Sequence, residues 1–233
     1  MDQTATASFN AEALRSTLQL ACILDDLKTR TRTGWKIWQV RSGRLESVSE
    51  HCHSCLLLAN LFYPIYPGHE QINLAKVNLM LIYHEIGETI IGDVAVIDKR
   101  RHANKADAEH AAWHKLLSGL PYEQEVYDLL LEFDERQTPE AIFAYRIDKF
   151  DATKSMKRYY DSGKFHKLKW SLAHSKMIRE NKDIQKLIAA GAKTPVDIWF
   201  ADEYTAPYND DKFFRAACQI IREMNTNIAP PSL

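Results

Sequence analysis

The chain has 233 residues, with 30 Lys and Arg against 31 Asp and Glu and a formal net charge of −1. Hydrophobic residues make up 45% of it and there are only 8 Gly and 8 Pro, which excludes disordered, collagen-like and repeat-array proteins. The balanced charge gives no basic field for nucleic acid or an anionic membrane, and no run approaches the ~18 apolar residues of a membrane span. We therefore expect a folded protein that binds neither nucleic acid nor membrane.

The beginning of the sequence and its cysteines both indicate a reducing compartment. Residues 1–6 are polar and lack the apolar middle of a secretory signal. Four cysteines in a chain of this length do not form a dense disulfide framework. We expect a cytoplasmic protein.

Apolar residues recur mostly with the helical period, whereas strict alternation is scarce, so we predict an all-α fold. The predicted helices cover residues 8–28, 47–62, 73–86, 104–118, 123–135, 139–162, 168–181 and 210–224. The segment 29–44 breaks the pattern with basic residues, aromatics and a glycine, which suits either a binding loop or a packed connector. Residues 189–206 are expected to form a peripheral excursion.

Two helices have clear sequence signals. Ser47 followed by Glu50 predicts a capping box, and Pro64 predicts the end of that helix. The run from Leu74 to Ile86 is apolar almost all round, which is typical of a helix buried on most sides. We place this helix at the centre of the fold.

Polar residues interrupt the apolar faces of three of these helices. His51 lies on the apolar side of the second helix, and Asp148 shares a face with small apolar residues of the helix after Pro139. On the central helix His84 and Glu88 are expected to share a face, with Glu85 about 100° further round. Each has an ordinary structural explanation when taken singly. Together, histidines and carboxylates from separate helices predict a mixed nitrogen and oxygen metal site.

These residues and their neighbours resemble the His…His-Asp…Asp signature of HD-domain metal-dependent phosphohydrolases. Three segments, 47–51, 84–94 and 147–151, resemble the corresponding segments of the 5′-deoxynucleotidase branch. Residues 32–35, Arg-Thr-Gly-Trp, resemble a segment of that branch's eukaryotic-like members. The chain departs from the family at Glu85, where the family has Asp, and at Gly34, where bacterial members commonly have Arg.

The resemblance implies a single domain built as an HD-domain helical bundle. We divide it into an N-terminal helix at residues 1–30, the HD core at 31–165 and a C-terminal helical extension at 166–233. Members of this family are usually dimers, so a homodimer is expected.

The resemblance also implies the site. It makes His51, His84, Glu85 and Asp148 the ligands of one divalent ion: Mn, Co, Mg, Fe or Zn. Glu88 is implied to hold or activate the attacking water.

The implied substrate is a 5′-deoxyribonucleoside monophosphate, hydrolysed to nucleoside and phosphate. Asp93 would assist proton transfer or bind the sugar, and Trp35 is expected to wall off the 2′ position unless it packs in the core. Arg32 or Arg41 would contact the phosphate, and Lys99 could add positive charge there.

Other interpretations stay open. Within the superfamily, a nucleoside triphosphatase or another small-phosphoester hydrolase is the enzyme alternative, and a degenerate binding module without metal is the non-enzyme one. A dinuclear enzyme that uses His102, His110 and His114 is less favoured, because solvent-facing histidines explain the pattern. Cys52 and Cys55 form a C-x-x-C pair that we interpret as packing. The absence of a second ligand histidine after His84-Glu85 argues against a metalloprotease.

Overall fold

The computed structural model describes residues 10–98, 104–165, 167–201 and 205–230. Within these ranges the regular elements are helices, and the β-type pairing recorded there is one isolated bridge between Thr31 and Ser47. The predicted all-α fold is confirmed. The α-helices are α1 (Ala11–Leu24), α2 (Thr33–Ile37), α3 (Val48–Phe62), α4 (Leu74–Tyr83), α5 (Glu88–Ile91), α7 (Lys105–Leu117), α8 (Glu123–Glu135), α9 (Pro139–Asp161), α10 (Leu168–His174), α11 (Lys176–Glu180), α12 (Lys182–Ala189), α13 (Pro195–Trp199) and α15 (Lys212–Glu223). The short 3₁₀ helices are η1 (Asp25–Lys28), η2 (Tyr63–Ile65), η3 (His69–Gln71) and η4 (Ala206–Tyr208).

Side-chain caps fix the starts of the helices that matter most for the site. The Ser47 hydroxyl accepts from the Glu50 amide and the Glu50 carboxylate accepts from the Ser47 amide, so the predicted capping box is confirmed. The Thr138 hydroxyl caps α9, whose first residue is Pro139. These caps set the rotation of α3 and α9 at their first turns.

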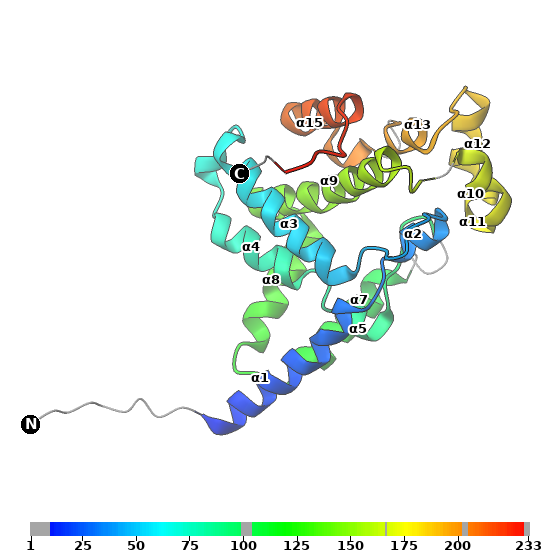
Figure 1. The fold of residues 1–233 in the computed structure, drawn as a ribbon. Helices are drawn as coiled ribbons and strands as arrows, with labels where there is room; N and C mark the ends of the chain where they lie inside the picture. Colours follow the sequence, from blue (N-terminus) through cyan, green and yellow to red (C-terminus); the bar gives the residue numbers. More distant parts are fainter. Residues whose placement is uncertain (1–9, 99–103, 166, 202–204, 231–233) are drawn as a thin grey trace, which may run out of the picture.

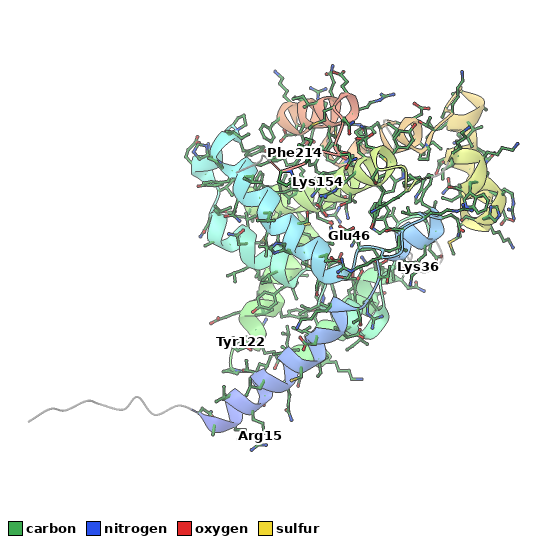
Figure 2. All side chains as sticks on the ribbon, viewed as in Figure 1. Arg15, Lys36, Glu46, Tyr122, Lys154 and Phe214 are labelled. Atoms are coloured by element: carbon green, nitrogen blue, oxygen red, sulfur yellow. The ribbon has the colours of Figure 1, made fainter. Side chains whose placement is uncertain are left out.

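Helix α9 lies at the centre of the molecule and contacts α3, α4, α8, α13 and α15 (Figure 1). One hydrophobic cluster extends from Trp35 to Ile221 and includes Phe143, Ile147 and Phe214. Figure 2 labels Phe214 on α15, beside α9. The C-terminal helices therefore pack on the same core as the helices that carry the predicted metal ligands.

Helix α1 projects from this bundle, and Figure 2 shows Arg15 on the projecting part. It contributes Leu20 to a second hydrophobic cluster with Ile86, Trp113 and Leu117. This cluster joins α1, α7 and α8 to the turn that follows α4.

The helix that the sequence places at the centre of the fold is shorter than predicted, and α9 takes the central position instead. Helix α4 ends at Tyr83, and residues 84–87 form turns before α5 begins at Glu88. The amides of Ile86 and Glu88 bond to carbonyls three residues earlier, which tightens the backbone. Gly87 allows a close approach, because a Cβ there would lie 3.0 Å from the Trp113 indole nitrogen. The expected continuous face from His84 to Glu88 is therefore wrong, although both side chains are buried.

Two predictions for the C-terminal part are also wrong. The helix expected over 168–181 is divided into α10 and α11, because Ser175 is extended and its side chain caps the second helix. The segment 189–206 is not wholly peripheral, since Val196 and Ile198 on α13 are buried against α9. A pattern of five helical residues is too short to be recognised from periodicity.

In the part of the chain that the structure describes, no helix combines the length and apolar character needed to cross a bilayer.

Candidate metal centre

His51 is completely buried where α3 packs against α9. Its Nε2 lies 3.0 Å from Oδ1 of Asp148, and its Nδ1 lies 2.8 Å from Oδ2 of Asp151. Burial alone would lower the pKa of His51, but its hydrogen bonds to these two carboxylates help raise the pKa well above the usual value. In the absence of a metal the ring is therefore protonated between two acids.

His84 enters the same space from the end of α4. Its Nδ1–H donates to the Leu81 carbonyl at 2.9 Å, and because a carbonyl can only accept, Nε2 carries the free lone pair. That Nε2 is buried and has no hydrogen-bond partner, and burial lowers the pKa of the ring. A neutral imidazole with an exposed lone pair in the interior is the form that binds a metal ion.

Two carboxylates complete the cluster. Oε1 of Glu85 lies 3.7 Å from Nε2 of both His51 and His84, and Oδ1 of Asp148 lies 3.9 Å from Nε2 of His84. Although burial opposes ionisation, His84 and Arg32 lower the pKa of Glu85 to about 2. The structure thus brings together all four side chains that the sequence predicts as ligands.

The donor set fits a divalent metal ion. Two imidazole nitrogens and two carboxylates suit Mn, Co, Fe, Zn or Mg, and a buried cluster of this kind without a cation leaves the His84 lone pair unused. The extra methylene of Glu85 does not take its carboxylate out of the cluster.

Cys55 is an alternative candidate for the fourth ligand, although its sequence context predicts a packing residue. One ligand atom from each of His51, Cys55, His84 and Asp148 lies within 4.8 Å of the others. Burial raises the pKa of Cys55 to about 12, so its sulfur is a thiol, whereas Glu85 is ionised. We favour Glu85 as the fourth ligand. Cys52 belongs to a different hydrophobic cluster from Cys55, so the pair does not form a shared site.

Glu88 is a second buried acid near the cluster, and its pKa is raised rather than lowered. It is 1% exposed, and its Oε2 has no hydrogen-bond partner. Burial, with the charges of Glu85 and Asp93, raises the pKa of Glu88 to about 10. Without a metal ion this carboxyl group is neutral, and it can exchange a proton with a group placed beside it.

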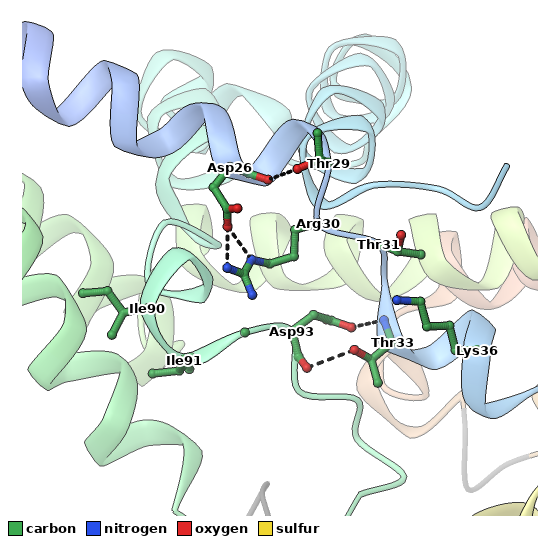
Figure 3. Close-up of a pocket in the computed structure, with 10 residues that line it drawn as sticks. Asp26, Thr29, Arg30, Thr31, Thr33, Lys36, Ile90, Ile91 and Asp93 are labelled. Carbon is green, nitrogen blue, oxygen red and sulfur yellow. Dashed lines mark hydrogen bonds and ion pairs between the residues drawn. The ribbon is translucent and has the colours of Figure 1, made fainter.

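Asp93 ties the segment before α3 to the loop after α5. Its carboxylate accepts a short hydrogen bond from the Thr33 amide, and its carbonyl accepts from the Thr33 hydroxyl at 3.1 Å (Figure 3). It also lines a polar cavity of about 550 Å³ together with Thr31, Thr33 and Lys36. Arg32, between the two threonines, points instead to Glu85.

The predicted substrate-binding residues are separated. The Arg32 guanidinium donates to Glu85 at 2.7 Å and lies 4.0 Å from Asp93, so it borders the cluster of predicted ligands. The Arg41 guanidinium stacks on the Trp170 ring at 3.7 Å, away from that pair. Lys99 lies outside the described residues.

Trp35 is an interior side chain. It is 3% exposed, its indole N–H donates to Glu46 at 2.8 Å, and its ring stacks on Trp199 and meets the edge of Tyr159. Its predicted role as a wall beside the sugar stays a prediction.

The extra histidines considered for a dinuclear site point elsewhere. Nε2 of His110 lies 3.3 Å from a carboxylate oxygen of Asp134, and the ring of His114 stacks on Tyr127. Asp134 and Tyr127 both belong to α8. His102 lies outside the described residues.

Two residues that contact the cluster were not predicted from the sequence. Lys149 places its ammonium 2.7 Å from the second oxygen of Asp148, and Asp151 contacts the rear nitrogen of His51. Both lie in the segment 147–151 that resembles the family, Lys149 directly after Asp148 and Asp151 one helical turn later.

Comparison with known proteins agrees with this geometry. The HD domain family matches residues 24–189, which include every described member of the cluster. The chain belongs to the HD domain family. The cluster of histidines and carboxylates is the feature that its sequence signature predicts.

Within the HD domain family, the chain is similar to curated proteins that are named 5′-deoxynucleotidases. The human protein named 5′-deoxynucleotidase HDDC2 is 27% identical over 163 residues, covering 69% of this chain and 76% of the relative. The Xenopus laevis protein of that name is 32% identical over 146 residues, covering 62% and 69%. The fission yeast 5′-deoxynucleotidase hdd1 is 28% identical over 156 residues, covering 64% and 75%.

Solved structures share the fold. A Magnetospirillum magnetotacticum protein described as a predicted metal-dependent phosphohydrolase has a TM-score of 0.62 at 20% identity, covering 91% of this chain and 94% of that one. A conserved hypothetical protein from Pyrococcus furiosus has a TM-score of 0.61 at 22% identity, covering 89% and 99%. At these identities the likeness supports the arrangement of the helices.

Proposed function

We propose that this HD-domain protein is a metal-dependent 5′-deoxynucleotidase, which hydrolyses deoxyribonucleoside monophosphates to deoxynucleosides and phosphate. One observation carries the proposal: two histidines and two acids from α3, the end of α4 and α9 converge in the interior, with the lone pair of His84 unused. The similarity to curated 5′-deoxynucleotidases supplies the substrate class.

We assign His51, His84, Glu85 and Asp148 as the ligands of one divalent ion. When bound, such an ion would polarise a phosphoryl oxygen and lower the pKa of a coordinated water. The four side chains orient that chemistry, because each is buried and fixed by a helix or a hydrogen bond.

Glu88 and Asp93 then act on the proton and the sugar. Glu88 holds the attacking water and exchanges a proton with it, which its high pKa and its free Oε2 support. Asp93, held by Thr33, assists that transfer or accepts from a sugar hydroxyl. Both side chains are buried, so bulk water does not compete strongly for them.

Arg32 is the arginine best placed for the phosphate, because its charge already borders Glu85 and Asp93. Of the two arginines predicted for the phosphate, Arg41 is given at most a minor part because it stacks on Trp170, whereas Trp35 and Lys99 keep their proposed contributions to substrate binding. Among the described members of this set, Arg32 is the one that contacts a proposed metal ligand.

We also propose a single domain with its HD core at residues 31–165, a cytoplasmic location and a homodimer. The four cysteines are free, which suits a reducing compartment. Leu57 and Leu61 on α3 and Leu79 and Ile82 on α4 are about half exposed or more, which supports an apolar contact with a second copy.

The test is phosphate release from matched dNMPs, NMPs and dNTPs with Mn, Co, Mg or Zn. We expect release from dNMPs, and a Glu88→Gln variant should lower kcat by roughly 10²–10⁴-fold. The control is Glu132→Gln, which removes a carboxylate that pairs with Lys76 on the α4–α8 side. Release from dNTPs alone would favour a triphosphatase, and no release with any metal would favour a binding module.

A further inference from the structure

Helix α9 holds His51 at both ring nitrogens. Asp148 faces Nε2 at 3.0 Å, and Asp151, one helical turn later, faces Nδ1 at 2.8 Å. The assigned ligand set uses Asp148 and leaves Asp151 without a role. Asp151 is nevertheless 0% exposed, and burying a carboxylate is costly unless every oxygen is paired.

Asp151 is fixed in place by a closed set of contacts between α3 and α9. Its Oδ1 accepts from the Ser54 hydroxyl and from the Lys154 ammonium, both at 2.6 Å. Lys154 also donates to Ser54 at 2.5 Å. Figure 2 labels Lys154, which belongs to α9. Because one oxygen serves Ser54 and Lys154, the other oxygen is left for His51.

This arrangement decides which of the two groups, His51 or Asp151, carries the proton between them. The Lys154 ammonium can only donate, and it pairs with Oδ1 of Asp151 at 2.6 Å, so this carboxylate is an acceptor that faces Nδ1 of His51 with its other oxygen. Nδ1 of His51 therefore carries the hydrogen. The nitrogen that would coordinate a metal ion, once its own proton leaves, is then Nε2, which faces Asp148 and Glu85.

We propose that Asp151 is a positioning residue, which holds His51 in the orientation and tautomer that bind the metal through Nε2. This assignment rests on the metal site of the proposed function. Asp151 acts through His51 and contacts neither substrate nor metal. Ser54 and Lys154 orient the carboxylate of Asp151 by binding one of its oxygens, so that the other oxygen faces His51.

The variant that tests this role is Asp151→Asn. Lys154 can only donate, so the amide oxygen of Asn would face Lys154 and Ser54. The amide NH₂ would then face Nδ1 of His51 and donate to it, which moves the ring hydrogen to Nε2 and blocks the lone pair.

The matched control is Asp161→Asn. Asp161 lies at the end of α9 and is bound by Lys157 at 2.6 Å and by Thr226 at 2.7 Å, so it also loses a lysine pair. It makes no contact with His51 among the described residues.

The measurement is calorimetric titration of the metal-free proteins with Mn²⁺, together with the visible absorption spectrum of their Co²⁺ forms. We expect Asp151→Asn to weaken Mn²⁺ binding about 10–100-fold and to change the Co²⁺ spectrum. Asp161→Asn should match the wild-type protein in both. Equal Mn²⁺ affinities and spectra for Asp151→Asn and wild type would overturn the assignment.

A second measurement needs no variant. In the Zn²⁺-loaded wild-type protein, ring-nitrogen NMR should show His51 protonated at Nδ1 and coordinated at Nε2. Protonation at Nε2 would overturn the proposal even if Asp151→Asn failed to fold. A wild-type protein that binds no divalent ion would overturn it as well. Metal binding without phosphate release from any nucleotide would refute the proposed function and leave this comparison valid.

Discussion

The helices that carry the proposed metal ligands and the segment that precedes α3 behave differently. His51 on α3, His84 at the end of α4 and Asp148 on α9 converge where the helical pattern predicts polar side chains on apolar faces. In residues 29–47, Arg32 turns to Glu85, whereas Trp35 turns into the core and Arg41 stacks on Trp170. These residues are close in sequence, yet their side chains have three different surroundings.

The difference lies in what sets the direction of a side chain. On a regular helix the spacing of residues fixes direction to a few tens of degrees, and a cap such as Ser47 sets the start. In an irregular segment, direction depends on distant partners. Here these are Asp93 for Thr33, Tyr159 for the Glu46 amide and Lys164 for the Arg41 amide.

The largest effect is expected from removing the unpaired Nε2 of His84, at the end of α4. His84→Ala removes a proposed ligand, and phosphate release from dNMPs should fall by about 10³-fold or more, because a bound metal supplies several kcal/mol. Thermal unfolding measures the same loss: at about 100 times its Kd, Mn²⁺ should stabilise wild type by about 2.7 kcal/mol, and this variant far less. His53→Ala, an exposed histidine on α3, is the control. Normal Mn²⁺ stabilisation of His84→Ala would contradict the site.

Trp35 tests the other region. Trp35→Ala should lower the free energy of unfolding by about 3–5 kcal/mol, because it empties the space between Tyr159 and Trp199. Urea denaturation of the metal-free protein measures this, and Trp35→Phe, which loses the bond to Glu46, should cost less. A folded Trp35→Phe with altered preference between dNMPs and NMPs would support the sugar-wall role as well. Unchanged stability of Trp35→Ala would contradict the packing.

Glu88 gives the metal-free protein a specific pH dependence. Its pKa is about 10 in the folded state against a usual value of 4.5, so the folded state keeps a proton that the unfolded state releases. Its contribution to stability is complete below pH 4.5 and is lost as the pH rises towards 10. Glu88→Gln should therefore gain stability relative to wild type as the pH rises from 5 to 9, by up to about 5 kcal/mol, because a difference of one bound proton is worth about 1.4 kcal/mol per pH unit.

Denaturation at several pH values measures this gain, and Glu132→Gln is the opposite control. Lys76 and Thr138 lower the pKa of Glu132 although burial opposes them, so its contribution is present above the usual pKa and lost as the pH falls through the folded one. A Glu88→Gln difference that stays constant with pH would contradict the assigned protonation.

The smallest expected effect is at Arg41. Its stacking on Trp170 is exposed, so Arg41→Ala should cost less than about 1 kcal/mol and leave KM for dNMPs within roughly twofold. Arg32→Ala should instead raise KM by on the order of tenfold, because a charge-assisted contact with phosphate is lost. Steady-state kinetics compares the two. Equal changes in KM would remove the distinction drawn between these arginines.

Helix boundaries were predictable where a cap or proline accompanies the period. Residues 47–62 and 123–135 differ from α3 and α8 by at most one residue. The end of helix α4 after Tyr83 was not predictable, because it depends on the close contact of Gly87 with Trp113, 26 residues later. The division at Ser175 and the burial of α13 likewise depend on packing that periodicity does not express.

The sequence by itself determined the all-α class and most of the helices. The spacing of residues placed His51, His84 and Asp148 on apolar helical faces, whereas Glu85 was assigned as a ligand only through the resemblance to the HD family. Only the tertiary structure decided the contacts around them. Asp151 behind His51, Lys149 beside Asp148 and Arg32 on Glu85 are set by how α3, α9 and an irregular segment meet. The physical reason is that local periodicity fixes which side of a helix faces inward, whereas the partner it meets there is chosen by the packing of the whole chain.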